Sequence, residues 1–149
     1  MKGVNVYTPL GQAAPVARFI DGLDPRLRDK LIRQLIELPN TPRASLREPH
    51  FKHFTLERYR DLYELRARGK VLVRIIFTIL PNGEILLLHA FIKRQSRDTM
   101  QALEQALSIM AQVRDRPELA AEYIAREETA ALPYAVPPGK VPGYPSTQF

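Results

Sequence analysis

The chain has 149 residues, no cysteine and a formal net charge of +6 at pH 7. The lack of cysteine excludes disulfide scaffolds and thiolate metal sites, and the length fits one domain with its own core. Its three histidines, His50, His53 and His89, lack the spacing of a helical metal site, and no stretch is apolar enough for a membrane span or a signal peptide. We therefore expect a cytoplasmic protein with no membrane contact and no metal or other cofactor.

Positive charge is concentrated in the middle of the chain. Residues 51–100 hold ten Lys and Arg against five Asp and Glu, whereas the residues after 100 hold four against six. A distribution this uneven favours a polyanionic partner, nucleic acid first, although an ordinary solvated basic surface would give the same counts.

The N-terminal part of the chain predicts a strand followed by two helices. Residues 4–7 are rich in β-formers and precede a turn that contains Pro and Gly. A first helix is predicted over residues 15–22, starting with proline, and a second over residues 24–38, with an Asp-Pro start and leucines on one stripe. Pro39 ends the second helix, because the residue before a proline disfavours helical geometry. We expect the apolar stripes of this helical hairpin to cover a sheet.

The sheet itself is predicted after a loop at residues 40–49. Its long strands span residues 61–68, 71–80 and 84–93, and residues 50–56 allow a short additional strand before them. Gly and Pro-Asn-Gly turn signals between the long strands predict an antiparallel meander. The last of these strands is apolar on both faces, so we expect it to be the most covered.

Helices are predicted for the segment after the strands. Asp98 is the expected N-cap of one helix, with Gln101 as its capping-box partner, and the expected apolar stripe is Met100, Leu103, Leu107 and Met110. A further helix is predicted from Pro117 to about residue 131. Five prolines in the last seventeen residues predict an extended tail. The chain is thus expected to be an α+β domain over residues 1–132, with a strand and a helical hairpin on a mainly antiparallel sheet followed by C-terminal helices, and a disordered, Pro-rich tail over residues 133–149.

Side-chain alternation along the strands sorts their charges onto one face. The odd positions of residues 71–80 are all apolar, so Arg74 lies on the opposite face of that strand. The simplest register places Arg66 and Arg68 of the preceding strand on the same surface as Arg74. An arginine among apolar residues is costly unless it is paired or solvated. Two interpretations remain open: a cross-strand ion pair between Glu64 and Arg74, or a concave basic surface for phosphate.

The third long strand ends in further cations. Lys93 and Arg94 alternate in direction where the strand ends, so at least one should face the same side as Arg74. His89 lies either in the core or at the rim of the basic surface. The chain has no Gly-rich phosphate loop, nucleophile elbow or metalloprotease motif. Cations and a histidine suit RNA cleavage through the substrate's own 2′-hydroxyl, because the protein then only orients the phosphodiester, stabilises its growing charge and moves protons.

Three segments in this order resemble the RelE/ParE toxin superfamily, and its HigB-like branch of phage-derived host-inhibition proteins most of all. They are Leu62-Tyr63-Glu64-Leu65-Arg66, Val73-Arg74-Ile75-Ile76-Phe77, and Leu87-Leu88-His89-Ala90-Phe91-Ile92-Lys93-Arg94, within a similarity that extends over roughly residues 4–113. The resemblance implies a RelE-like fold and the toxin of a type II toxin–antitoxin module. Its activity would be that of a metal-independent, ribosome-dependent mRNA endoribonuclease, which leaves a cyclic phosphate. Its partners would be a cognate antitoxin, expected to be a helix-turn-helix protein, and mRNA on the ribosome.

The resemblance also assigns roles to single residues. Arg66 and Arg74 would bind and stabilise the scissile phosphate, and Lys93 or Arg94 would supply the cationic transition-state stabiliser or acid. RelE itself has a tyrosine a little beyond the arginine that follows its last strand. Residues 95–100 contain no tyrosine, which leaves His89 and His53 as candidate bases. The residues predicted to bind RNA are Lys52, His53, Arg68 and Arg97.

Two other functions fit the same residues. One is a ParE-like inhibitor of DNA gyrase without nuclease activity, which supercoiling assays would separate from RNA cleavage. The other is a catalytically silent nucleic-acid-binding regulatory protein of a phage, which would leave cell growth unaffected on induction. The sequence does not predict the antitoxin, the codon preference, the oligomeric state or the purpose of the tail.

Overall fold

A computed structural model of the chain describes residues 3–124. The predicted tail and the end of the last predicted helix lie outside these residues. The described elements are, in chain order, β1 (Val4–Tyr7), α1 (Pro15–Asp21), α2 (Pro25–Glu37), β2 (Phe51–His53), β3 (Tyr63–Arg68), β4 (Leu72–Ile79), β5 (Ile85–Ile92), α3 (Ser96–Asp115) and β6 (Ala120–Ile124). Within the described part of the chain, no helix is long and apolar enough to cross a membrane.

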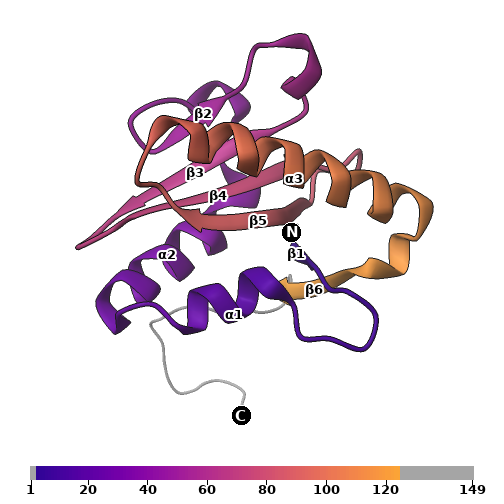
Figure 1. The fold of residues 1–149 in the computed structure, drawn as a ribbon, viewed down its shortest axis with the longest axis horizontal. Coiled ribbons are helices and arrows are strands. Elements are labelled where there is room, and N and C mark those ends of the chain that lie inside the picture. Colours follow the sequence, from indigo (N-terminus) through magenta and orange to yellow (C-terminus); the bar gives the residue numbers. More distant parts are fainter. Residues whose placement is uncertain (1–2, 125–149) are drawn as a thin grey trace.

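The six strands form one sheet in the order β2-β3-β4-β5-β1-β6 (Figure 1). Strands β2 to β5 pair antiparallel with their neighbours in sequence, which confirms the predicted meander and the short strand before it. Strand β1 pairs parallel with β5, and β6 pairs antiparallel with the other edge of β1. The predicted α+β class and RelE-like architecture are confirmed.

Helices cover both faces of this sheet, with α1 and α2 on one face and α3 on the other (Figure 1). Strand β5 is central and its first half is buried on both sides, as the apolar run predicts. The core under α1 and α2 includes Val16, Ile20, Leu31, Leu65, Ile75, Phe77 and Leu87. The core under α3 includes Leu62, Ile76, Leu86, Leu88, Leu103, Ala106 and Ile109.

The predicted start of the second helix is confirmed in detail. The Asp24 carboxylate accepts hydrogen bonds from the backbone N–H groups of Arg26 and Leu27 at 3.2 and 3.4 Å. These contacts satisfy amides that have no partner within the helix. Pro25 has no backbone N–H, so its position needs no hydrogen-bond partner. Leu27, Leu31 and Leu35 then form the buried stripe of α2.

Helix α3 begins earlier than predicted, and Asp98 is not its N-cap. The helix starts at Ser96 with Gln95 as the N-cap, and Asp98 lies in the first turn. The Asp98 carboxylate reaches back to accept the backbone N–H groups of Arg94 and Gln95 at 2.8 and 2.9 Å. An acidic residue in the first turn can also accept hydrogen bonds from backbone amides at the start of a helix. Asp98 was therefore mistaken for the N-cap, which lies three residues earlier.

The predicted apolar stripe of α3 was also wrong in part. Met100 is 48% exposed, and the buried positions are Ala102, Leu103, Ala106, Ile109 and Val113. The prediction followed large side chains, whereas the buried face of this helix includes two alanines, which let it lie close to β5.

The helix predicted from Pro117 is absent from the described residues. A single 3-10 turn at Pro117–Leu119 leads into β6, whose Ala120 and Ala121 pair with Tyr7 and Val6 of β1. Alanine and glutamate favour a helix locally, but β1 would otherwise have an unpaired edge, and tertiary pairing overrides weak propensity.

Candidate nucleic-acid interface

Arg66 of β3 and Arg74 of β4 are direct cross-strand partners on the sheet face that carries α3. Their side chains are only 24% and 12% exposed. Like charges directly opposite one another destabilise a sheet unless another group compensates them. This pair therefore needs an anion, either from the protein or from a ligand.

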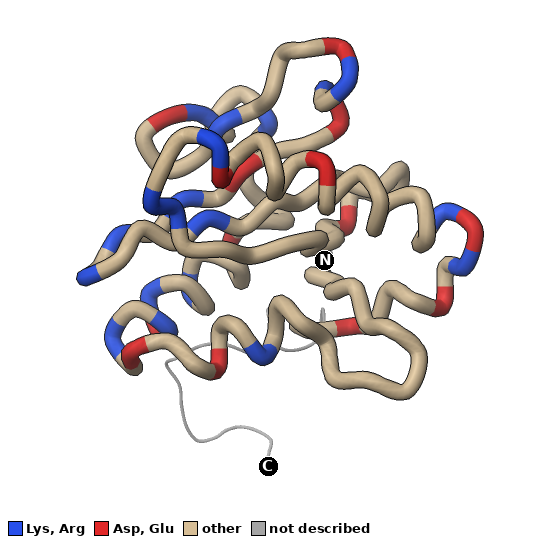
Figure 2. Tube along the Cα trace, in the orientation of Figure 1, with Lys and Arg blue, Asp and Glu red and all other residues tan. Residues whose placement is uncertain are grey.

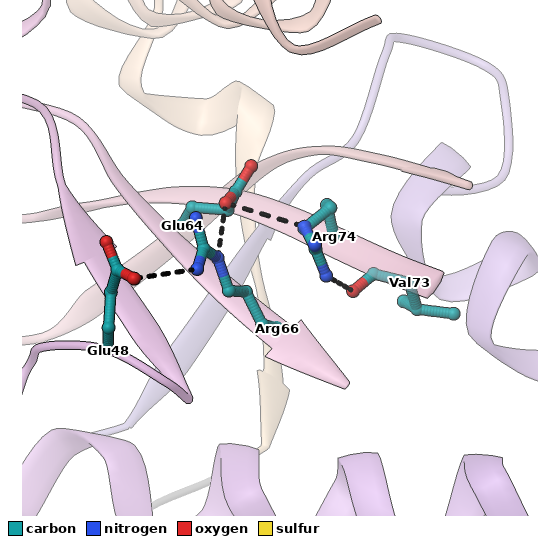
Figure 3. Close-up of polar contacts among 5 residues, drawn as sticks. All are labelled: Glu48, Glu64, Arg66, Val73 and Arg74. Carbon is teal, nitrogen blue, oxygen red and sulfur yellow. Dashed lines mark hydrogen bonds and ion pairs between the residues drawn. The ribbon is translucent and has the colours of Figure 1, made fainter. Parts of the chain in front are cut away.

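Glu64 supplies that charge within the protein (Figure 3). Its Oε1 accepts a hydrogen bond from Arg66 Nε at 2.9 Å and lies 3.6 Å from Arg74 Nε, and its side chain is 2% exposed. Arg66 also lies 3.6 Å from Glu48 through Nη1. The predicted ion pair between Glu64 and Arg74 is therefore present, while the phosphate-binding surface stays a prediction.

The buried charges are incompletely satisfied. Among the described residues, Glu64 Oε2 and Arg74 Nε have no hydrogen-bond partner. Burial lowers the pKa of Arg74, Glu64 opposes this, and the neighbouring charges of Arg66 and Arg68 lower it further. Arginine stays protonated at neutral pH in proteins, so two cations face one buried carboxylate here. The partly dehydrated setting strengthens their attraction for an added anion.

The same face continues across β5 toward α3. Phe91 pairs with Arg74, and His89 pairs with Ile76. The rings of His89 and Phe91 are nearly parallel, at 17°, with centroids 6.0 Å apart. His89 is half-buried, which places it at the rim of the basic face, and burial lowers its pKa from the ordinary 6.5. The lowered pKa favours the neutral form of its imidazole.

Lys52 extends the face to the other side, because it pairs with Glu64 across β2 and β3. Its ammonium group lies 5.6 Å from the centre of the Phe54 ring. Cross-strand partners share a face, so Lys52 belongs to the same surface as Arg66 and Arg74. The structure thus brings this predicted residue to the arginines.

The structure does not bring His53 there. Its ring stacks on Tyr63 with centroids 4.4 Å apart, and Tyr63 stacks on Phe77 at 5.4 Å. Phe77 belongs to the core under α1 and α2, on the opposite face of the sheet. The His53 Nε2 atom also lies 2.6 Å from the Arg60 carbonyl oxygen. Neighbours on a strand point to opposite faces, so Lys52 and His53 cannot both face the arginines.

The remaining predicted cations lie at one end of the molecule. Lys93 follows Phe91 by two residues and by alternation continues its row, while Arg94 is exposed beside the pocket that His89 and Phe91 line. Arg97 is exposed in the first turn of α3, and Arg68 at the end of β3. Figure 2 shows Lys and Arg gathered at this end, where the β3–β4 turn, the end of β5 and the start of α2 lie.

Some polar residues of this region carry no sequence signal of function. Gln101 and Gln105 of α3 line the pocket next to His89 and Phe91. Their spacing of four residues shows only that they share a helix face, and the placement of α3 on the sheet decides what that face meets. Among the described residues, no group of three His, Asp or Glu side chains is arranged to hold a metal ion.

Residues 18–111 match the family described as phage derived protein Gp49-like (DUF891), a span of more than half of the chain. No curated protein matches the chain. The Gp49-like family is associated with toxins of toxin–antitoxin modules, and such a toxin implies a cognate antitoxin. The resemblance to RelE/ParE toxins is thereby confirmed at the level of the group, while the narrower HigB-like assignment stays a prediction. The chain belongs to the phage-derived Gp49-like family, within the RelE/HigB-type toxin group.

Proposed function

We propose that this protein is a HigB-like toxin that cleaves mRNA on the ribosome. The observation that carries the proposal is the cross-strand pair of Arg66 and Arg74, fixed by one buried carboxylate oxygen of Glu64. Two guanidinium groups held side by side at the surface of a rigid sheet match the two non-bridging oxygens of a phosphodiester. The family supplies the toxin context.

The reaction that suits this site is an attack of the substrate's 2′-oxygen on the adjacent phosphorus. The bond from phosphorus to the 5′-oxygen breaks, giving a 2′,3′-cyclic phosphate and a 5′-hydroxyl end. The 2′-hydroxyl loses its proton to a base, and the leaving 5′-oxygen gains one from an acid. The arginines act by stabilising the charge that grows on the phosphate oxygens, which is the largest contribution expected of such donors.

The proton transfers fall to residues that flank the arginines. We assign the base to His89, because its neutral imidazole can accept a proton and because it lies one strand away from Arg74 on the same face. Lys93, which continues the row of His89 and Phe91, is assigned to the leaving oxygen, with Arg94 as the neighbouring cation. Lys52, Arg68 and Arg97 would contact the phosphates on either side.

A purified translation system tests the proposal directly. Wild-type protein should cleave ribosome-bound mRNA and leave ends with a cyclic phosphate, whereas Arg66→Ala and Arg74→Ala should each lower the cleavage rate about 100-fold or more. Arg18→Ala is the matched control, because Arg18 is exposed on α1 at the opposite face. Circular dichroism establishes that each variant is folded.

The same preparations discriminate between the remaining functions. Inhibition of gyrase supercoiling without any mRNA cleavage would replace the nuclease by a ParE-like activity. Nucleic-acid binding with neither cleavage, gyrase inhibition nor an effect on cell growth would indicate a silent regulatory protein. Cleavage that survives both arginine substitutions would refute the phosphate site.

A further inference from the structure

A larger pocket, of about 770 Å³, lies away from the arginine pair, between the end of β4, the start of β5 and the last turns of α3. We call it the α3–β4 pocket. Figure 1 shows that α3 begins near the end of β5 and finishes near its start, so the two ends of the helix border different sites. Thr78 and Leu80, which line the α3–β4 pocket, lie about 13–20 Å beyond Arg74 along the extended strand. The pocket is therefore separate from the arginine face.

The buried lining of the α3–β4 pocket is apolar. Leu86 of β5 and Val113 of α3 are buried there, and Met110 is partly buried beside them. The Thr78 hydroxyl is already engaged, because it donates a hydrogen bond to the Asp61 carbonyl oxygen at 2.8 Å. A polar ligand group placed on this lining would lose water without gaining a partner. The lining therefore suits a hydrocarbon or aromatic group, and the volume falls within the roughly 300–1,000 Å³ of pockets that bind small organic molecules.

The rim of the pocket is cationic. Arg43, Arg60 and Arg114 are exposed there, and Asp61 is the one carboxylate among the described residues that line it. Arg60 is engaged by Glu57 at 2.9 Å. Within residues 3–124, neither Arg43 nor Arg114 forms an ion pair. Guanidinium groups bind carboxylates through two parallel hydrogen bonds, so the rim complements an anionic group.

Stacked rings form a further part of the wall. His53 and Tyr63, whose ring centroids lie 4.4 Å apart, both line the pocket. The His53 Nε2 atom also lies 2.6 Å from the Arg60 carbonyl oxygen. These contacts hold the rings in place before any ligand arrives, which lowers the entropy cost of binding. The structure thus gives His53 a place at this pocket, away from the arginine pair.

We propose that the α3–β4 pocket binds a small apolar acid, with its aliphatic or aromatic body on the apolar lining and its carboxylate at the arginine rim. The inference goes beyond mRNA cleavage and does not rest on it. An inorganic anion would leave the apolar lining without contacts, and a neutral apolar molecule would leave Arg43 and Arg114 without a partner. A molecule that has both parts complements the whole pocket.

Amide NMR titrations of the whole chain test the proposal with hexanoate, octanoate and decanoate, each below its micelle-forming concentration. The signals of Leu80, Met110 and Arg114 should shift and reach saturation. The Kd should fall about two- to fourfold with each added methylene, because burial of that group favours binding. Octanol has the same chain length as octanoate but no charge, and it should bind about threefold more weakly.

Substitutions at the rim test the contribution of charge. Arg114→Gln should weaken octanoate binding about threefold, and Arg43→Gln with Arg114→Gln should remove its advantage over octanol. Arg116→Gln is the matched control, because Arg116 is also exposed but lines a different pocket. Arg74→Ala should leave octanoate binding unchanged, because the two sites are separate.

Three results would overturn the proposal. The first is the absence of saturable shifts at Leu80, Met110 and Arg114. The second is equal affinity for octanoate and octanol, since the arginine rim would then contribute nothing. The third is octanoate binding that is lost in Arg74→Ala but kept in the variants of the rim, which would place the anion at the arginine pair. Saturable binding that depends on chain length and charge, in a protein that cleaves no mRNA, would support the pocket and count only against the nuclease.

Discussion

The ion pair between Glu64 and Arg74 can be measured by a double-mutant cycle. The variants are Glu64→Gln, Arg74→Gln and the combination, which remove each charge with little change in volume. Opposite unit charges 3.6 Å apart attract by about 5 kcal/mol at an effective dielectric constant of about 20. Arg66 contacts the same carboxylate oxygen at 2.9 Å and compensates part of its charge when Arg74 is replaced, so we expect a coupling free energy of about 2 kcal/mol.

Urea unfolding followed by circular dichroism gives the four free energies of unfolding. The stability losses of the two single variants should sum to more than the loss of the double variant, because each single variant leaves a partly buried charge with less compensation. Glu57 and Arg60 provide a control cycle, since their ion pair is 2.9 Å long but 83% and 65% exposed. Exposed helical pairs couple by only about 0.3–0.5 kcal/mol. A coupling for Glu64 and Arg74 no larger than the control's would refute the idea that Glu64 holds Arg74 in place.

Three further predictions concern stability and titration. The Arg58 guanidinium, bonded to the Glu104 carboxylate at 2.6 and 2.8 Å, holds the pKa of that carboxyl at about 2, below the ordinary 4.5. A carboxyl with a depressed folded-state pKa stabilises the protein above its unfolded pKa, so the difference in Tm between wild type and Glu104→Gln should shrink as the pH falls from 5 toward 2. A gap that widened with acid would contradict this assignment. Ala106→Leu should destabilise the protein by about 1–3 kcal/mol in thermal unfolding, because Ala106 is fully buried on the sheet-facing side of α3, whereas Met100→Gln on the exposed side of the same helix should stay within about 0.5 kcal/mol. In NMR titration, the His89 ring should titrate below pH 6.5, with the signal assigned by its loss in His89→Gln, and the mRNA cleavage rate should rise with pH through that value because the base must be neutral. Titration above 6.5 would show that burial does not govern this ring.

The sequence predicts the part of the fold that depends on short-range signals. Turn residues set the β3–β4 and β4–β5 hairpins, and side-chain alternation correctly placed Arg66 and Arg74 on one face. Both signals act between residues that are close in the chain, so one sequence is enough to recognise them.

The errors arise where distant parts of the chain decide the outcome. Residues 120–124 have helix-forming alanines and glutamate, yet they form β6 because the edge of β1 is available. Gln101 and Gln105 gain their place in the pocket only from the way α3 lies on the sheet. His53 was predicted to bind RNA or to act as the base, but alternation places it on the face opposite Lys52 and the arginines.

The position of β1 has a consequence for how the sheet is assembled. Val4 pairs with both Ile85 and Ile124, so the first strand of the chain joins its neighbours only after long loops have closed. The hairpins that carry Arg66 and Arg74 close through short turns instead, and loop-closure entropy opposes them far less. The arginine face therefore belongs to the half of the sheet with local connectivity, and β1 and β6 join that half of the sheet through β5.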